Sequence, residues 1–523
     1  MSRSTAARPR FSIVPGVARQ PSALVRFSLI SIVAAGAALR FWNITAGLPY
    51  RIGVDEPIIA GRALNIMKTG NFNPQFFDYP GLYIYTQVLI GCARFISGAM
   101  DEMWRSLDQF NAEDLFLWTR SLNALLGTIT LVVLYRAGLR WGTRVALLAA
   151  GLLAVWPNHI RESHFALTDV PLTLLTTATL VLSFRAFETA RLKWFLWAGA
   201  CAGLAASTKY TGALTLVMPL IAAAGIIDTR QNRLLDALAS IGAAAAAFLA
   251  GSPYTLLDMP AFLNSFGALA KEFRPRTLSS GLEVYARHLQ SASGWTGLVT
   301  IGAAFVWAGV RAVRDRNLTK WALVIVFPIL HLYLISTKNL VYARYLLPAL
   351  PFICLLVAIA LVDLIERVVL RLRQPRWVRS TAAILVVAVI WVPVAVQGFK
   401  WPKQYGRATT QDVAYKMIRN FIPAQSTVAV ERSVIRLPDS LYHTINVNNL
   451  TERSLEEYVS SGVRFFIASS DAFDPVLAQP AGQPDAYRAY RRLLDEAGQC
   501  LPTVSPTPTL PGPQIRICRL RID

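Results

Sequence analysis

Repeated apolar segments, separated by short polar connections, constrain the fold of this chain more than any other feature. They lie near residues 24–44, 121–139, 145–157, 170–187, 194–208, 213–227, 237–254, 295–312, 321–336, 345–365 and 381–398. An apolar helix of about 20 residues spans the hydrocarbon core of a bilayer. Of the 523 residues, 54% are hydrophobic and only 16% are charged. The sequence therefore predicts an α-helical polytopic membrane protein with about 11 spans.

The net charge of +21 comes largely from arginines and lysines grouped between the apolar segments. Because basic residues concentrate in cytoplasmic loops, this grouping indicates membrane orientation rather than binding to nucleic acid. Residues 1–24 are then a cytoplasmic basic tail. No small-residue cleavage site follows the first apolar segment, so we expect it to be retained as a span. An odd number of spans places the C-terminal part outside, as in a multi-pass protein of the bacterial inner (plasma) membrane with a periplasmic C-terminus.

The run from Leu82 to Met100 decides the orientation of everything that follows. If it spanned the membrane, Arg136, Arg140 and Arg144 would lie on the external face, against the usual distribution of basic residues. A helix lying on the membrane surface leaves them in the cytoplasm. We therefore assign residues 45–119 to an external loop with interfacial helices, inside a transmembrane catalytic domain of residues 25–399.

Residues 400–523 carry a different pattern, in which short helical and strand-like runs alternate. Helices are predicted near 412–421 and 455–460, and strands near 427–431, 463–468 and 515–522. This alternation predicts a small external α/β domain. Cys500 and Cys518 lie in it, and an oxidising compartment would permit a disulfide around the proline-rich loop between them. Two buried thiols are the alternative.

Two adjacent carboxylates, Asp55 and Glu56, lie just beyond the first apolar segment. One interpretation is structural: Asp55 caps a helix that has Pro57 in its first turn and ends before Gly70. The other is chemical, because acids are otherwise rare beside the apolar segments. The sequence alone leaves both open.

Further ionisable residues are predicted at the same external interface. Asp169 lies where the chain re-enters the membrane, and Arg161, Lys209 and Arg344 are cations at that level. Each cation could be a snorkelling anchor, and Asp169 could cap a helix. Ionisable groups at this depth are nevertheless candidates for function. Together they suit a reaction in which a base activates a hydroxyl while a phosphate leaves.

Five motifs in order resemble the GT-C glycosyltransferases of family 39, the dolichyl-phosphate-mannose protein mannosyltransferase-like enzymes that include bacterial lipid A aminoarabinose transferases. The motifs are the Asp55-Glu56 pair, DYPGLY at 78–83, HFALTDVP at 164–171, STKYTG at 207–212 and ARYLLPALP at 343–351. The resemblance covers roughly residues 25–400. It implies a GT-C membrane fold and an inverting transfer of one sugar from a polyprenyl-phosphate carrier to an acceptor on the external face.

The resemblance also implies roles for particular residues. Asp55 would be the catalytic base, Glu56 its partner and Asp169 the second acid. Lys209 and Arg344, together with Arg161 from the same interface, would bind the donor phosphate. The substrate pocket would contain Asp78, Tyr79, Tyr83, His164 and Tyr210.

The expected partners are a polyprenyl-phosphate-linked sugar, an acceptor lipid, glycan or protein, and membrane lipid. No cofactor is required by this chemistry, although oxygen ligands from Asp55, Glu56 and Asp169 would suit a divalent cation. An oligosaccharyl or polymerising transferase of the same superfamily is an alternative, as is a non-enzymatic transporter of lipid-linked sugars. A transporter would be expected to place ionisable residues in the middle of several spans.

Overall fold

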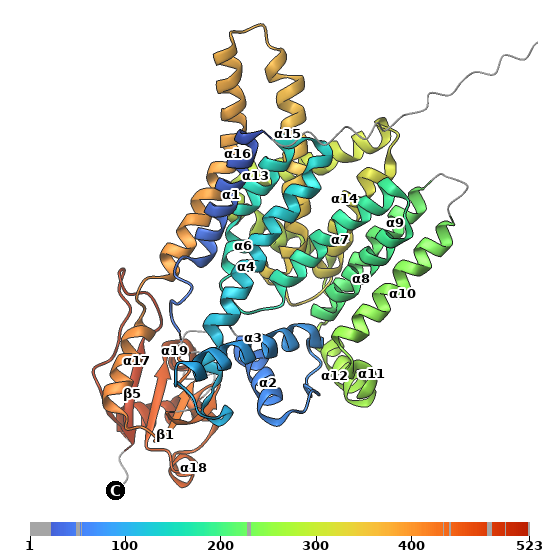
Figure 1. The fold of residues 1–523 in the computed structure, drawn as a ribbon. Helices are drawn as coiled ribbons and strands as arrows, with labels where there is room; N and C mark the ends of the chain where they lie inside the picture. The colour runs from blue at the N-terminus through green and yellow to red at the C-terminus, as the bar shows by residue number, and fades with distance from the viewer. Residues whose placement is uncertain are drawn as a thin grey trace, which may run out of the picture.

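The computed structural model describes residues 22–48, 53, 55–226, 232–431, 434–438, 441–478, 484–496 and 498–520. Most of these residues are helical, and a bundle of long helices forms the larger part of the molecule (Figure 1). Most of the predicted cytoplasmic tail, residues 1–21, lies outside the described residues.

A helix occurs at every position where the sequence predicts a span. The bundle comprises α1 (Ala23–Phe41), α4 (Ala112–Gly138), α5 (Thr143–Ala154), α7 (Asp169–Thr189), α8 (Leu192–Thr208), α9 (Val217–Gly225), α10 (Arg233–Gly251), α13 (Leu278–Arg314), α14 (Leu318–Ser336), α15 (Leu350–Arg367) and α16 (Arg376–Tyr405). Eight helical segments among the described residues are long and apolar enough to cross a membrane. The other three predicted spans correspond to the shorter helices α5, α8 and α9. The polytopic helical fold class is therefore confirmed.

The apolar stretch from Trp194 to Ile227 is divided where the polar residues interrupt it. α8 ends at Thr208, Lys209 is extended with φ −155°, and the short 3₁₀ helix η3 (Tyr210–Leu216) precedes α9. Gly212 packs against the preceding helix so closely that a Cβ would lie 2.2 Å from the carbonyl oxygen of Ala205. This break brings Lys209 to the end of the bundle.

One end of the bundle is covered by shorter helices. α2 (Glu56–Thr69) and α3 (Gly81–Met100) lie across this end, and α3 runs crosswise to the long helices (Figure 1). Their apolar faces share a core that includes Ile59, Tyr83 and Phe116. α6 (Pro157–Glu162), α11 (Tyr254–Leu257) and α12 (Met259–Glu272) complete the set of short helices. This arrangement agrees with interfacial helices in the first loop.

The C-terminal residues form a five-stranded sheet with strand order β2-β1-β3-β5-β4. The strands are β1 (Thr427–Glu431), β2 (His443–Val447), β3 (Phe465–Ser469), β4 (Gly498–Cys500) and β5 (Ile515–Leu520). β1 pairs in parallel with β2 and β3, whereas β5 is antiparallel to β3 and β4. The accompanying helices are α17 (Thr410–Phe421), α18 (Leu455–Ser460), α19 (Ser470–Leu477) and α20 (Pro484–Arg491).

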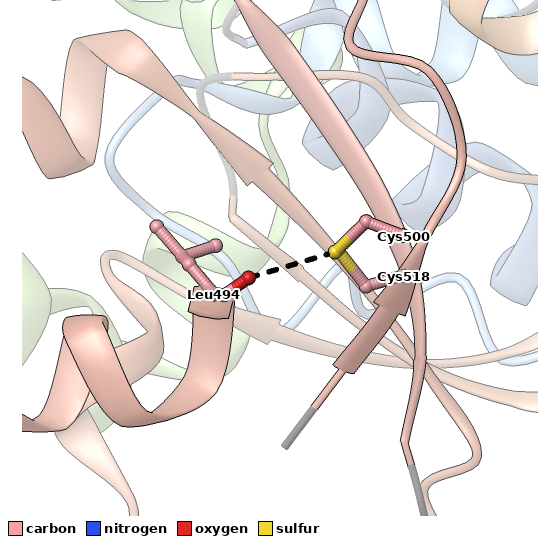
Figure 2. The surroundings of a disulfide bond; sticks show 3 residues. All are labelled: Leu494, Cys500 and Cys518. Carbon is pink, nitrogen blue, oxygen red and sulfur yellow. Dashed lines mark hydrogen bonds between the residues drawn. A yellow bond between two sulfur atoms is a disulfide. The ribbon is translucent and has the colours of Figure 1, made fainter. Parts of the chain in front are cut away.

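This sheet lies at the same end of the molecule as α2 and α3 (Figure 1). Side chains of α17 pack in one apolar core of the sheet, and those of α18, α19 and α20 pack in a second. Cys500 and Cys518 form a disulfide that joins β4 to β5 (Figure 2). The sequence therefore predicted the α/β character and left open a disulfide, which the structure shows, but it missed β2, β4, α19 and α20.

Candidate active site

Asp55 lies immediately before α2, with its side chain directed at two donors. The Tyr79 hydroxyl donates to its Oδ2 at 3.0 Å, and the Arg344 guanidinium donates to the same oxygen at 2.9 Å. Asp55 occupies the N-cap position of α2, which has Pro57 in its first turn and ends before Gly70 as predicted, but the Asp55 side chain makes no capping hydrogen bond. A guanidinium is a stronger partner for a carboxylate than a backbone N–H, because the hydrogen bond is charge-assisted at both ends.

Asp169 forms the second half of the same cluster. Its Oδ1 lies 2.7 Å from the Lys209 ammonium, and its Oδ2 lies 4.0 Å from Nε of Arg344. Asp169 is the first residue of α7 and its side chain does not cap that helix. Asp55, Arg344, Asp169 and Lys209 thus form a row of alternating charges, which we call the charge array. It combines acids and cations that the sequence predicted separately.

Four segments that are distant in the sequence supply the charge array. They are the start of α2, the short 3₁₀ helix η4 (Ala343–Ala349), the start of α7 and the break between α8 and η3. The Asp55 and Arg344 side chains are each 19% exposed, whereas the Asp169 side chain is 3% exposed. Asp55 is therefore the carboxylate that an incoming molecule can reach, and Asp169 is the buried counter-ion.

Tyrosine rings surround the cations of the array. The Lys209 ammonium lies 4.5 Å from the centroid of the Tyr345 ring, and the Arg344 guanidinium lies 5.1 Å from that of Tyr342. Such contacts hold a cation in place without neutralising it. Burial and the nearby Asp55 and Asp169 charges raise the pKa of Tyr79, which therefore stays protonated and donates to Asp55.

Glu56 does not belong to the array. It forms a bidentate ion pair with Arg120, at 2.9 and 2.7 Å, and both side chains are fully buried. Its oxygens also accept the backbone N–H groups of Gly53 and Ala166, each at 2.6 Å. The prediction of Glu56 as a direct catalytic partner of Asp55 is therefore corrected. Glu56 ties the start of α2 to α4 and to the segment that leads into Asp169.

Two of the predicted substrate-pocket residues, Tyr83 and His164, are buried inside the protein. Tyr83 is buried among apolar side chains and donates to Oδ1 of Asn123 at 2.9 Å. His164 is buried, and its two ring nitrogens lie 2.8 and 2.9 Å from the carbonyl oxygens of Ile160 and Trp42. Burial lowers the pKa of His164. Both side chains hold elements together and neither faces the charge array.

The remaining predicted residues lie around the array without joining it. The Arg161 side chain is 51% exposed, and its guanidinium lies 3.7 Å from Glu162. The Tyr210 hydroxyl donates to the carbonyl oxygen of Phe77 at 2.8 Å, and Asp78 is exposed. Of the nine predicted residues other than Asp55 and Asp169, only Lys209, Arg344 and Tyr79 thus make direct contacts within the cluster.

Glu162 is a residue of this region that sequence reasoning missed. It is 3% exposed and lies in α6. Burial raises the pKa of Glu162 to about 7; Arg161 opposes that shift, and the nearby charge of Asp169 adds to it. A buried carboxylate is a signal that sequence cannot supply here, because Glu162 follows Arg161 in a loop where a surface ion pair would be the ordinary expectation.

Asp55, Glu56 and Asp169, the three acids proposed as ligands of a divalent cation, are not arranged to bind one ion together. Both oxygens of Glu56 are used by Arg120 and by two backbone N–H groups, so Glu56 cannot turn toward the others without losing them. Asp55 and Asp169 face Arg344 and Lys209 instead of each other. Among the residues that the structure describes, no group of three His, Cys, Asp or Glu side chains could hold a metal ion. The metal prediction for these three residues is therefore corrected.

Residues 83–263 match the family model of dolichyl-phosphate-mannose-protein mannosyltransferase. This match covers Asp169 and Lys209 but ends before Arg344 and begins after Asp55. No curated protein sequence matches the chain significantly. The match therefore supports the class of enzyme, while the complete site is visible only in the fold.

Solved structures share the fold at low sequence identity. The structure of ArnT from Cupriavidus metallidurans bound to undecaprenyl phosphate has a TM-score of 0.58 and 16% identity, covering 94% of this chain and 97% of that one. The archaeal oligosaccharyltransferase AglB from Archaeoglobus fulgidus, in complex with an inhibitory peptide and a dolichol-phosphate, has a TM-score of 0.54 and 13% identity, covering 86% and 69%. The same archaeal enzyme in complex with zinc and sulfate has a TM-score of 0.53 and 12% identity, covering 87% and 68%.

The helical bundle with its interfacial helices and C-terminal sheet is thus a GT-C fold. Together with the family-model match over residues 83–263, this fold makes the chain similar to membrane glycosyltransferases of the GT-C superfamily.

Proposed function

We propose that this protein transfers a sugar from a polyprenyl-phosphate carrier to an acceptor hydroxyl at the end of the bundle where α2, α3 and the C-terminal sheet lie (Figure 1). The observation that carries the proposal is the position of Arg344, which contacts the accessible carboxylate Asp55 and approaches the buried carboxylate Asp169. Arg344 thus lies beside both Asp55, the base in this proposal, and Asp169, which holds the cations that would bind the phosphate. The GT-C neighbours solved with dolichol-phosphate and undecaprenyl phosphate support this class of donor.

Asp55 is the base in this proposal. Among the described residues its Oδ1 accepts no hydrogen bond, since Tyr79 and Arg344 both donate to Oδ2. Oδ1 is thus available to an acceptor hydroxyl, and the partial exposure of the side chain lets a substrate reach it. A general base must lie within hydrogen-bond reach of the proton that it removes.

Lys209 and Arg344 bind the phosphate of the carrier. Both are held beside tyrosine rings and are partly exposed, at 15% and 19% of their side chains. Asp169 keeps the two cations at this position in the absence of substrate, because it is almost fully buried and contacts both. Preorganised cations stabilise charge that develops on a leaving group.

The reaction is a direct displacement. The acceptor oxygen forms a bond to the anomeric carbon while the bond from that carbon to the phosphate oxygen breaks. The acceptor proton passes to Asp55, and the phosphate leaves with the carrier lipid beside Arg344 and Lys209. A single displacement inverts the configuration at the anomeric carbon.

With this mechanism we also propose the membrane orientation and the domain bounds that the sequence predicts. The protein lies in the bacterial inner membrane with its N-terminus in the cytoplasm. Residues 25–399 form the catalytic domain, and residues 400–523 form a domain on the external face. The alternative of an oligosaccharyl or polymerising transferase uses the same fold and donor class. Mass spectrometry of the product distinguishes the two reactions, because the proposed enzyme adds one sugar and an oligosaccharyl or polymerising transferase adds a chain of sugars.

The decisive experiment is transfer by Asp55→Asn in proteoliposomes supplied with a polyprenyl-phosphate sugar. Release of the carrier phosphate should fall by about 100- to 10,000-fold, the usual contribution of a general base. Asp108→Asn is the matched control, since Asp108 is an exposed acid of the same external loop outside the array. Transfer by Asp55→Asn at the wild-type rate would refute the assignment, and absence of phosphate release by the wild type with any such donor would favour the transporter.

A further inference from the structure

A second cluster of charged and aromatic side chains lies at the opposite end of the bundle from the charge array. It surrounds a cavity of about 280 Å³ between the short 3₁₀ helix η2 (Leu139–Trp141), the C-terminal parts of α13 and α15 and the start of α14. The C-terminal part of α15 leads to the connection with α16, which projects away from the sheet (Figure 1). This cavity therefore belongs to neither the proposed transfer site nor its approach.

Three tryptophans form the aromatic part of the wall. The Trp141 and Trp307 rings both pack against Trp321, with centroid distances of 5.9 and 5.5 Å. The Lys320 ammonium lies 4.4 Å from the Trp141 ring centroid, and the Arg311 guanidinium lies 5.6 Å from that of Trp307. The rings thus position two cations beside the cavity.

The wall contains two cations, Arg311 and Lys320, and three carboxylates, and some of its donors have no acceptor nearby. Within the described chain, no carboxylate lies within 4.0 Å of the Lys320 ammonium, whose hydrogen bond goes to the carbonyl oxygen of Arg140 at 3.3 Å. Nε of Arg311 and Nε1 of Trp141 are buried and have no hydrogen-bond partner among the described residues. A buried donor without an acceptor costs about 1–3 kcal/mol. Three side chains of one cavity therefore have donor capacity that the protein does not use.

The acids of the same wall already have partners. Asp315 contacts Arg311 at 3.3 Å and accepts from Nε1 of Trp321 at 3.3 Å. Asp363 is bonded to Arg367 at 2.7 Å, and Glu366 to Arg144 at 3.1 Å. The unused donors of the cavity thus suit a ligand that accepts hydrogen bonds.

We propose that this cavity binds the phosphate ester of an anionic membrane-lipid headgroup. A phosphate offers several oxygen acceptors around one centre and can meet donors that converge from different helices. The tryptophans and cations lie at the ends of membrane-length helices, where both are enriched at the headgroup level. Cations in a pocket between transmembrane helices are a common feature of headgroup sites. The same chemistry would suit a soluble phosphate, so the experiment must distinguish the two sources.

Binding can be measured by native mass spectrometry of the full chain, titrated with phosphatidylglycerol or with zwitterionic phosphatidylcholine. The wild type should bind phosphatidylglycerol in preference. Lys320→Gln should weaken that binding roughly tenfold, because one charge-assisted hydrogen bond is lost. Trp141→Phe is a second variant that keeps an aromatic ring but removes the Nε1–H donor, and it should also weaken binding. Arg314→Gln is the control, since Arg314 is an exposed cation at the end of α13, the helix that carries Arg311, and does not line the cavity.

Several outcomes would overturn the proposal. Equal affinity of the wild type and both variants for phosphatidylglycerol would show that the cavity is not the site. Equal binding of the two lipids would remove the charge preference on which the proposal rests. Displacement of the lipid by millimolar inorganic phosphate, or binding of inorganic phosphate without lipid, would assign the cavity to a soluble anion instead.

Discussion

The adjacent acids Asp55 and Glu56 should respond in opposite ways to the same chemical change. Asp55→Asn is expected to abolish transfer and leave stability nearly unchanged, whereas Glu56→Gln is expected to destabilise the fold. The difference follows from their surroundings. Asp55 is partly exposed beside Arg344, and Glu56 is fully buried against Arg120.

The magnitudes come from the partners that each variant leaves behind. Glu56→Gln leaves the buried Arg120 guanidinium without a countercharge and turns an amide NH₂ toward donors that include the N–H of Ala166. Removing one partner of a buried ion pair costs about 3–5 kcal/mol. Asp55→Asn keeps an oxygen for Tyr79, and Arg344 retains Asp169 nearby, so the cost should be clearly smaller than that of Glu56→Gln.

Thermal unfolding in detergent at one fixed scan rate measures the difference. Midpoints at one scan rate are compared because membrane proteins often unfold irreversibly. The double variant Glu56→Leu with Arg120→Met is the control: removing both charges should recover much of the loss, since a buried pair replaced by apolar side chains is often neutral. A midpoint of Glu56→Gln equal to that of the wild type would refute the reasoning.

Three further predictions concern donor binding, pH and the C-terminal sheet. Lys209→Gln should raise KM for the donor at least about tenfold in steady-state kinetics, because one charge-assisted contact to phosphate is lost. The pKa of Glu162 is raised from its ordinary value of 4.5 to about 7, so the folded state holds a proton that the unfolded state has released between those values. Wild-type stability should therefore fall as pH rises from about 4.5 to 7, and Glu162→Gln should remove that slope and gain on the order of 3 kcal/mol above pH 7 in unfolding experiments. The disulfide closes a separation of 18 residues, so replacing Cys500 and Cys518 by serine should cost the sheet about 3 kcal/mol, measurable by proteolysis of the C-terminal residues.

The long helices and the approximate place of the site followed from the sequence because both depend on local patterns. Apolar runs of span length have few alternatives to a membrane helix. Acids and cations at the ends of those runs are costly inside a bilayer, so they locate one interface. The sequence also predicted Lys209 at a break between two short helices, and the extended residue there bears this out.

Partners across long sequence separations could not be predicted. Arg120 directly precedes the predicted span 121–139, where snorkelling is the ordinary expectation, and only the packing of α2 on α4 buries it against Glu56. Consecutive residues of a helix point about 100° apart. Nothing in a single sequence says which of Asp55 and Glu56 faces the site. β2 was missed because three of its five residues are polar and only Val447 is fully buried, as suits an edge strand.

The charge array links donor binding to activation of the base in the proposed reaction. Without substrate, Arg344 and Tyr79 both occupy Oδ2 of Asp55, and the two cations are neutralised by two carboxylates. A carrier phosphate brings negative charge that competes with Asp55 for Arg344. As Arg344 turns toward the phosphate, Asp55 gains freedom to face an acceptor hydroxyl with its charge no longer paired. Asp169 stays with Lys209 because it is buried, so the phosphate site persists while the base is released.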